Sequence, residues 1–185
     1  MRRYRDLQSG RFDLMLFESP AWGWQDIAYE TLGMQIEDAE VYVARHQAGR
    51  DEHYFDELKG KRMALYSGYH YGFAGFNADK QFLADQFNAV LTYSHDSNLI
   101  MLLRGRADVA VVTRSYLYAY QQHYPEQSSA LLISQRVDQV YQHQALFGPQ
   151  STISPVFADL LKQLHRNQQL DKLLSRYHLR DLYGQ

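Results

Sequence analysis

Short apolar runs alternate along the chain with stretches whose apolar residues recur every three or four positions. The short runs predict strands, and the recurring positions predict helices. Strands are expected at residues 41–43, 62–66 and 90–93, and helices at residues 79–87 and 114–124, the last of which ends before Pro125. Strands that alternate with helices in this way indicate an α/β protein with mostly parallel sheets and flanking helices.

Two further amphipathic faces lie near the C-terminal end of the sequence. The first consists of Phe157, Leu160, Leu161 and Leu164, and the second of Leu170, Leu173, Leu174 and Tyr177. Both faces have the i, i+3, i+4, i+7 spacing of a helix that packs on a core. Asn167 and Gln168 interrupt the pattern between them, so we expect a pair of helices that covers a sheet.

One motif occurs twice, as Leu-x-x-Gly-Arg-x-Asp followed by four apolar residues. The first copy spans residues 7–17 and the second spans residues 102–112. The glycine can end a helix in the left-handed conformation, and the apolar run predicts a buried strand directly after it. Two copies of one helix-to-strand unit predict two similar α/β lobes in a single chain.

The two copies differ in how much of the preceding helix is present. In the second copy, Asp96 or Ser97 is placed to cap a helix whose apolar stripe includes Leu99 and Leu102. The first copy begins inside the corresponding helix. We therefore expect lobe 1 to be incomplete at its N-terminus.

The flanking parts of the sequence are expected to combine into one lobe around a complete middle block. Lobe 1 would comprise residues 1–47 and 136–185, and lobe 2 residues 48–135. This arrangement requires the chain to cross between the lobes twice.

Charge and composition exclude several classes of function. The 19 basic and 21 acidic residues are interspersed, and the net charge of −2 gives no electrostatic footprint for nucleic acid or an anionic membrane surface. Because there is no cysteine, disulfides and thiolate chemistry are excluded, while the compartment stays open. No apolar run has the length of a membrane span, and no metal-ligand spacing or catalytic motif occurs, so we expect no cofactor, no metal and no enzymatic activity.

Four segments of the chain carry a resemblance to a known family. They are residues 7–14, Leu58-Lys59-Gly60-Lys61-Arg62 leading into Ser67-Gly68-Tyr69, residues 105–111, and residues 170–177. In this order and spacing they resemble the family 3 solute-binding proteins, the receptors that deliver amino acids and similar small polar solutes to ABC importers. The resemblance covers residues 4–179.

The resemblance implies a type II periplasmic binding-protein architecture, with a small polar solute bound in the cleft between two lobes that close on it. It also implies a periplasmic location and the permease of an ABC transporter as partner, although the sequence as written shows no signal peptide. Further sequence before Met1 is implied as well, so the chain is expected to be a fragment with an exposed sheet edge. The same fold serves as the input domain of signalling proteins and in dehydratase-like enzymes, which are the alternative functions.

Candidate site residues follow the predicted strands, because ligands of open α/β sheets bind beyond the carboxyl ends of the strands. The candidates are Glu18, Ser19, Trp22, Trp24 and Gln25 after the first strand, Tyr66, Ser67, Gly68, Tyr69 and His70 after the strand that opens lobe 2, and Thr113 and Arg114 after the repeated strand. Residues 94–98 form a fourth strand end, where we expect Asp96 to cap a helix rather than to contact the ligand.

The nature of the solute stays open in the sequence. Relatives specific for amino acids place an arginine and an acidic residue where this chain has Gln25 and Thr113, so the usual clamp for an α-amino acid is not implied. Trp22 and Trp24 suit a sugar ring, an aromatic solute or a cationic group, with Glu18 balancing positive charge, unless they only pack against the lobe. The segment 67–69 suits close approach of a ligand to the backbone, and equally a simple tight turn.

Overall fold

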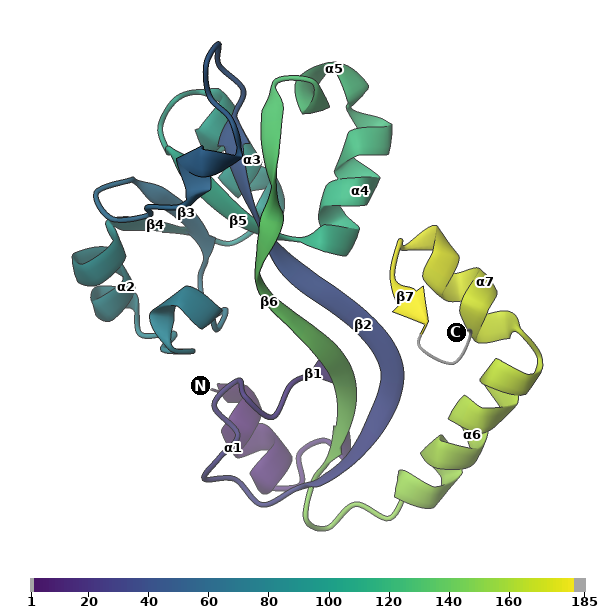
Figure 1. Cartoon of the computed structure of the whole chain (residues 1–185). Coiled ribbons are helices and arrows are strands. Elements are labelled where there is room, and N and C mark those ends of the chain that lie inside the picture. The colour runs from purple at the N-terminus through teal and green to yellow at the C-terminus, as the bar shows by residue number, and fades with distance from the viewer. Residues whose placement is uncertain (1, 182–185) are drawn as a thin grey trace. The chain divides into compact units, whose positions relative to one another are not determined.

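The computed structural model describes residues 2–181 and divides the chain into two compact units (Figure 1). Unit 1 consists of Met1–Asp38 and Tyr141–Gln185, and unit 2 of Ala39–Val140. Strands β2 (Glu30–Arg45) and β6 (Leu131–Phe147) each contribute residues to both units. The lobe boundaries expected at 47/48 and 135/136 therefore fall within unit 2, because these strands are longer than the sequence pattern indicated.

The sheet of unit 2 has the strand order β2-β5-β3-β4. Strand β3 (Met63–Tyr66) is parallel both to β4 (Ala89–Thr92) and to β5 (Val109–Thr113), whereas β2 runs antiparallel to β5. Because parallel strands need crossover connections, the chain between them forms helices that cover the sheet. The α/β architecture expected from the sequence is confirmed.

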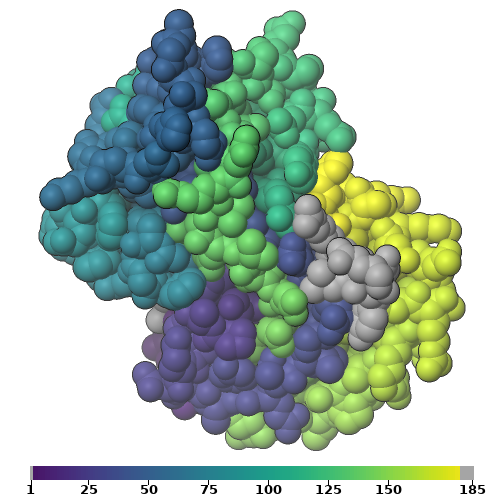
Figure 2. Space-filling view, viewed as in Figure 1, coloured from purple at the N-terminus to yellow at the C-terminus, as the bar shows by residue number. Residues whose placement is uncertain are grey.

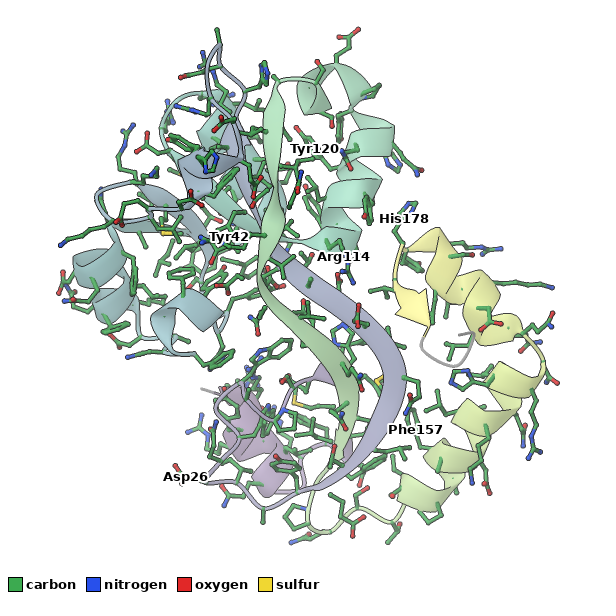
Figure 3. The ribbon with its side chains drawn as sticks, in the orientation of Figure 1. Asp26, Tyr42, Arg114, Tyr120, Phe157 and His178 are labelled. Atoms are coloured by element: carbon green, nitrogen blue, oxygen red, sulfur yellow. The ribbon has the colours of Figure 1, made fainter. Side chains whose placement is uncertain are left out.

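Successive residues of the central strands pack into two separate cores. Val41 and Val43 join Ala110 and Val112 in one cluster, while Tyr42 and Ala44 join Val109 and Val111 in the other. This period of two is the signature of a strand buried on both faces. In Figure 3, Tyr42 and Tyr120 lie on opposite sides of the strands, each within one of these cores.

Helices cover both faces of the sheet of unit 2. The face with Val43 packs against Leu99 and Leu102 of α3 (His95–Leu103) and Leu117 and Tyr120 of α4 (Arg114–His123), which is followed by α5 (Pro125–Ser128). The face with Tyr42 packs against η1 (Glu52–Phe55), η2 (Gly72–Ala74) and α2 (Lys80–Phe87). Burial of apolar surface on both faces is the main source of stability for such a layered unit.

Strand β6 is attached to η1 by polar contacts as well. The hydroxyl of Ser134 donates a 2.6 Å hydrogen bond to Glu52, and the guanidinium of Arg136 donates a 2.6 Å bond to the carbonyl of Phe55. In Figure 2 the green band of β6 accordingly lies beside the blue segment that contains η1. The sequence did not predict β6, because its polar residues between 135 and 144 obscure the strand pattern.

Unit 1 contains antiparallel pairs, which differs from the mostly parallel sheet expected for this lobe. Strand β1 (Leu14–Glu18) pairs with β6, and β7 (Arg180–Asp181) pairs with β2. Between β1 and β2 the described chain forms no helix, and β1 pairs with β6, a strand from a distant part of the sequence.

The predicted pair of C-terminal helices is confirmed in α6 (Ser154–Arg166) and α7 (Gln169–Arg176). Leu161, Leu170 and Leu174 pack on Met34, Ile36, Ala145 and Phe147 of the strands. The helices are separated at Gln168, whose φ of +54° is left-handed. On another part of unit 1, Leu7 of α1 (Arg2–Gln8) packs with Trp24 and Leu146.

The duplicated motif adopts the same backbone turn in both places. Gly10 has φ +71° and Gly105 has φ +67°. Each glycine N–H donates to the carbonyl three residues earlier, and each following arginine N–H donates to the carbonyl five residues earlier. This is the Schellman ending of a helix, so the predicted helix-to-strand turn is confirmed in both copies.

Two local expectations were wrong. Helix α3 is capped by Ser94, whose hydroxyl accepts the N–H of Ser97 at 3.0 Å, and not by Asp96 or Ser97. In β1, Leu16 and Phe17 are exposed rather than buried, because the pairing register shifts between Met15 and Glu18 and Phe17 takes φ +60°. A bulge of this kind turns side chains away from the core.

Candidate functional site

The ends of three parallel strands converge in unit 2 on one histidine. The ring of His95, the first residue of α3, lies 5.3 Å from the rings of Tyr66 and Tyr69 and 5.1 Å from that of Tyr116, measured between centroids. Tyr66 ends β3, His95 follows β4, and Tyr116 lies in the first turn of α4 after β5. We call these four side chains the tyrosine box.

His95 is the least satisfied polar side chain of this box. Only 8% of its surface is exposed, and neither ring nitrogen has a hydrogen-bond partner within residues 2–181. Burial lowers the pKa of the imidazole to about 4, so the ring is neutral at pH 7, with one N–H donor and one acceptor nitrogen. A buried polar group without a partner destabilises the fold, so its presence here calls for a functional explanation.

The loop after β3 presents its backbone at the edge of the box. The N–H of Ser67 donates to the carbonyl of Thr92 at 2.8 Å, which joins this loop to the end of β4. Gly68 has φ +89°, a conformation that side-chain-bearing residues rarely adopt. The N–H of Tyr66 donates to the hydroxyl of the fully buried Tyr71 at 2.8 Å. The loop is thus an ordered turn, and Gly68 occupies the position whose backbone conformation favours glycine.

Strand β6 fixes the far end of the same loop. The carboxylate of Asp138 accepts the N–H groups of Gly72 at 2.6 Å and Phe73 at 2.8 Å, and the amide of Gln139 donates to the carbonyl of His70 at 2.6 Å. The hydroxyl of Tyr42 donates to Asp138 at 2.7 Å. His70 itself is buried. Together these hydrogen bonds hold the loop that follows Tyr66 and carries Tyr69 against β6.

A buried amide supports the box from beneath. Asn98 is fully buried, accepts the Thr92 hydroxyl at 2.5 Å and donates to the carbonyl of Val111 at 3.3 Å. These bonds join β4, α3 and β5 just below the strand ends. Thr113 and Arg114, both half-buried, occupy the junction of β5 and α4, where Figure 3 shows Arg114 at the beginning of the helix.

In unit 1, Glu18 and Trp24 belong to an internal network. Trp24 is completely buried, and its indole N–H donates to Glu18 at 2.9 Å. Arg3 lies 3.3 Å from the other carboxylate oxygen of Glu18, and the ring of Tyr4 meets Trp24 edge to face at 4.6 Å. Burial raises the pKa of Glu18, an effect that Arg3 and the indole oppose. The structure therefore gives Trp24 a packing role.

The other unit 1 candidates lie in the turn between these two residues or just after it. The N–H of Trp22 donates to the carbonyl of the buried Ser19 at 3.0 Å, and Gln25 is exposed. The half-buried ring of Trp22 meets Tyr141 at 4.9 Å and the buried His143 at 6.4 Å. Of the two tryptophans, Trp22 is the one that offers surface to a ligand.

Sequence reasoning missed His95 and Tyr116. The sequence pattern marks residues 94–98 as a strand end, where it predicts Asp96 or Ser97 as a helix cap and gives no role to His95. His95 stands out only because Tyr66, Tyr69 and Tyr116 pack around its ring. These tyrosines are distant in sequence, so no local pattern could have identified His95. Among the described residues, no cluster of three or more histidine, aspartate or glutamate side chains is arranged to hold a metal ion, and no helix is long and apolar enough to cross a membrane.

Comparisons with known proteins match the chain by structure and not by sequence. No family model matches it, and no curated protein does. It is similar to the substrate-binding protein of an amino acid ABC transporter, with a TM-score of 0.67 and 18% identity over 94% of this chain and 74% of that one. It is also similar to the arginine-, lysine-, histidine-binding protein ArtJ from Geobacillus stearothermophilus, with a TM-score of 0.69 and 13% identity over 94% and 73% of the two chains.

A third similar structure comes from a signalling protein. It is a histidine kinase sensor domain with similarity to periplasmic binding proteins, matched with a TM-score of 0.64 and 16% identity over 94% of this chain and 73% of that one. The three structures are binding or sensor proteins, and likeness at this identity establishes a common fold. The protein therefore has the fold of the two-lobed periplasmic solute-binding proteins.

Proposed function

We propose that this protein binds a small polar solute and serves as the receptor component of an ABC-type importer, with the permease as its membrane partner and the periplasm as its location. The observation that carries the proposal is His95, a buried imidazole without a hydrogen-bond partner among the described residues, at the point where three strand ends meet. Ligands of α/β sheets bind at such edges. The amino acid-binding proteins with the same fold support the same role.

The proposed contacts in unit 2 are the tyrosine box, the turn Ser67–Gly68 with His70 behind it, and the β5–α4 junction at Thr113 and Arg114. In unit 1, Glu18, Ser19, Trp22 and Gln25 stay candidates, whereas the burial of Trp24 favours support of Glu18 over direct contact. A receptor releases its solute unchanged, so we propose no catalytic role for any of these residues.

The test combines calorimetry with NMR. The purified chain is titrated with amino acids, sugars, polyamines and aromatic acids, and the imidazole ¹³C–¹H signals of its eight histidines are followed in parallel. The His95 signal is assigned by its loss in His95→Gln. We expect one solute class to bind with 1:1 stoichiometry and to move the His95 signal. Absence of binding heat with every class would contradict the proposal.

A sensor input domain is the second candidate, because one similar structure is a histidine kinase sensor domain. The two functions are separated by uptake of radiolabelled solute in cells. A receptor is required for uptake, whereas loss of a sensor domain leaves the transport rate of its ligand unchanged.

A further inference from the structure

We propose that the tyrosine box binds an uncharged aromatic or heteroaromatic ring of the solute through the imidazole of His95, so that the protein takes ring-bearing carboxylates in preference to α-amino acids. The inference rests on the proposed solute-binding function and names the class of solute. It follows from the unpaired nitrogens of His95, the aromatic walls around them and the distribution of charge at this edge of unit 2.

The hydrogen-bonding capacity of His95 defines the first requirement on the ligand. A neutral imidazole offers one donor and one acceptor, and both are without a partner within the described chain. A phenolic hydroxyl can accept the N–H or donate to the bare nitrogen, and a heterocyclic nitrogen can accept the N–H. Either group would satisfy a polar atom that otherwise destabilises the folded protein.

The walls of the box define the second requirement. The rings of Tyr66 and Tyr69 are stacked, with 4.4 Å between their centroids. Tyr116, in the first turn of α4 after β5, lies 5.1 Å from the ring of His95. Aromatic rings favour edge-to-face and offset contacts with other rings. A flat ring that hydrogen-bonds to His95 can therefore pack against the neighbouring tyrosine rings.

Charge around the box disfavours an ammonium group. Burial lowers the pKa of His95, and the rings at 5.1–5.3 Å from its imidazole belong to Tyr66, Tyr69 and Tyr116. The nearest acidic residue in sequence, Asp96, accepts the Tyr116 hydroxyl at 3.1 Å and lines a separate groove of about 330 Å³ with Ile100, Tyr120 and Tyr124. An ammonium in the box would gain contact with tyrosine faces, but the Asp96 carboxylate is already bonded to Tyr116, and cation–π attraction is weaker than the hydration that an ammonium loses on burial.

The same edge suits a carboxylate. Helices α3 and α4 both begin here, so their N-terminal N–H groups and positive dipole ends lie at this edge. Arg114 is the first residue of α4 and adds a guanidinium cation. A solute with a ring at one end and a carboxylate at the other could place its ring in the tyrosine box and its carboxylate near the helix N-termini and Arg114.

The experiment compares ring carboxylates with amino acids in matched variants. The probes are 4-hydroxybenzoate and nicotinate on one side, and arginine, glutamate and histidine on the other. His95→Leu removes both hydrogen-bonding groups, His95→Gln keeps a donor and an acceptor, and His123→Leu is the control at an exposed histidine of the same unit. Calorimetry gives the dissociation constants, and urea unfolding gives the stability of each ligand-free variant.

We expect wild type and His123→Leu to bind at least one ring carboxylate, with affinity roughly tenfold lower in His95→Leu and within a few-fold of wild type in His95→Gln. The ligand-free His95→Leu variant should be as stable as wild type or more so, which separates lost binding from lost folding. Amino acids bound in preference to ring carboxylates, or equal affinities in wild type and His95→Leu, would overturn the inference and leave the receptor function standing. Failure of both probe classes to bind would overturn the inference, and failure of sugars and polyamines as well would contradict the receptor function itself.

Discussion

The carboxylate of Asp138 on β6 binds the backbone of Gly72, whose N–H donates to it at 2.6 Å. The next N–H, that of Phe73, donates to the other carboxylate oxygen at 2.8 Å. One side chain thus satisfies the first two N–H groups of the short helix η2, directly after the loop that leads from the tyrosine box. The conformation of the candidate binding loop at residues 67–71 therefore depends on β6, a strand that is distant in sequence.

Replacement of Asp138 by asparagine should destabilise unit 2. Asparagine keeps the shape but turns one acceptor into a donor that faces a backbone N–H, and the charge that strengthens these bonds is lost. We expect the free energy of unfolding to fall by about 1–3 kcal/mol. Urea unfolding measures the change, and Asp85→Asn is the control, because Asp85 accepts only an exposed bond from Gln81. Equal effects of the two substitutions would contradict this role of Asp138.

Gly72 should not tolerate a side chain. A Cβ at this position would lie 2.8 Å from the backbone carbonyl oxygen of Asp138, which cannot move without disturbing β6. We expect Gly72→Ala to lower the melting temperature and to cost about 1–3 kcal/mol. Gly33→Ala is the control, since a Cβ there meets only side-chain atoms at 3.5 Å or more. A Gly72→Ala protein as stable as the control would show that the backbone at this contact yields easily.

The two tryptophans should respond differently to substitution by phenylalanine. Trp24→Phe removes the N–H that bonds to the buried Glu18 and leaves a cavity, so we expect a loss of roughly 2–4 kcal/mol. Trp22→Phe should cost less, because Trp22 is half-buried and keeps an aromatic ring against Tyr141. Chemical denaturation of both variants tests the order, and acrylamide should quench Trp22 fluorescence more than that of Trp24. The reverse order in either measurement would contradict the buried network.

Acid should destabilise the protein partly through His95. Its pKa is about 4 when folded and near 6.5 when unfolded, so the unfolded state binds more protons between these values. Above pH 6.5 the ring is neutral in both states and protonation costs nothing, and as pH falls towards 4 the preferential protonation of the unfolded state lowers the stability by roughly 2–3 kcal/mol. Urea unfolding of His95→Leu between pH 4.5 and 7 should show a shallower pH dependence than wild type or His123→Leu. Burial also lowers the pKa of His143, so part of the slope should persist.

Several elements of the fold were determined by the sequence alone. Gly10 and Gly105 end their helices in the same turn, the apolar run 109–112 forms a strand buried on both faces, and the helices at 154–166 and 169–176 separate at Gln168. In each case the cause is local. A glycine that allows positive φ, a continuous apolar run and a helical apolar period act within a few residues, so they can be recognised without the rest of the protein.

The tertiary structure decided the remaining features. Segment 131–147 forms the strand β6 in spite of its polar sequence, because β1 and the carboxylate of Glu52 bond to its backbone. Trp24 and His95 each follow a strand in the sequence, and only packing with distant residues makes one a core residue and the other a buried ring without a hydrogen-bond partner. The physical reason is that burial and hydrogen-bond satisfaction are properties of all neighbours together, most of which lie far away along the chain.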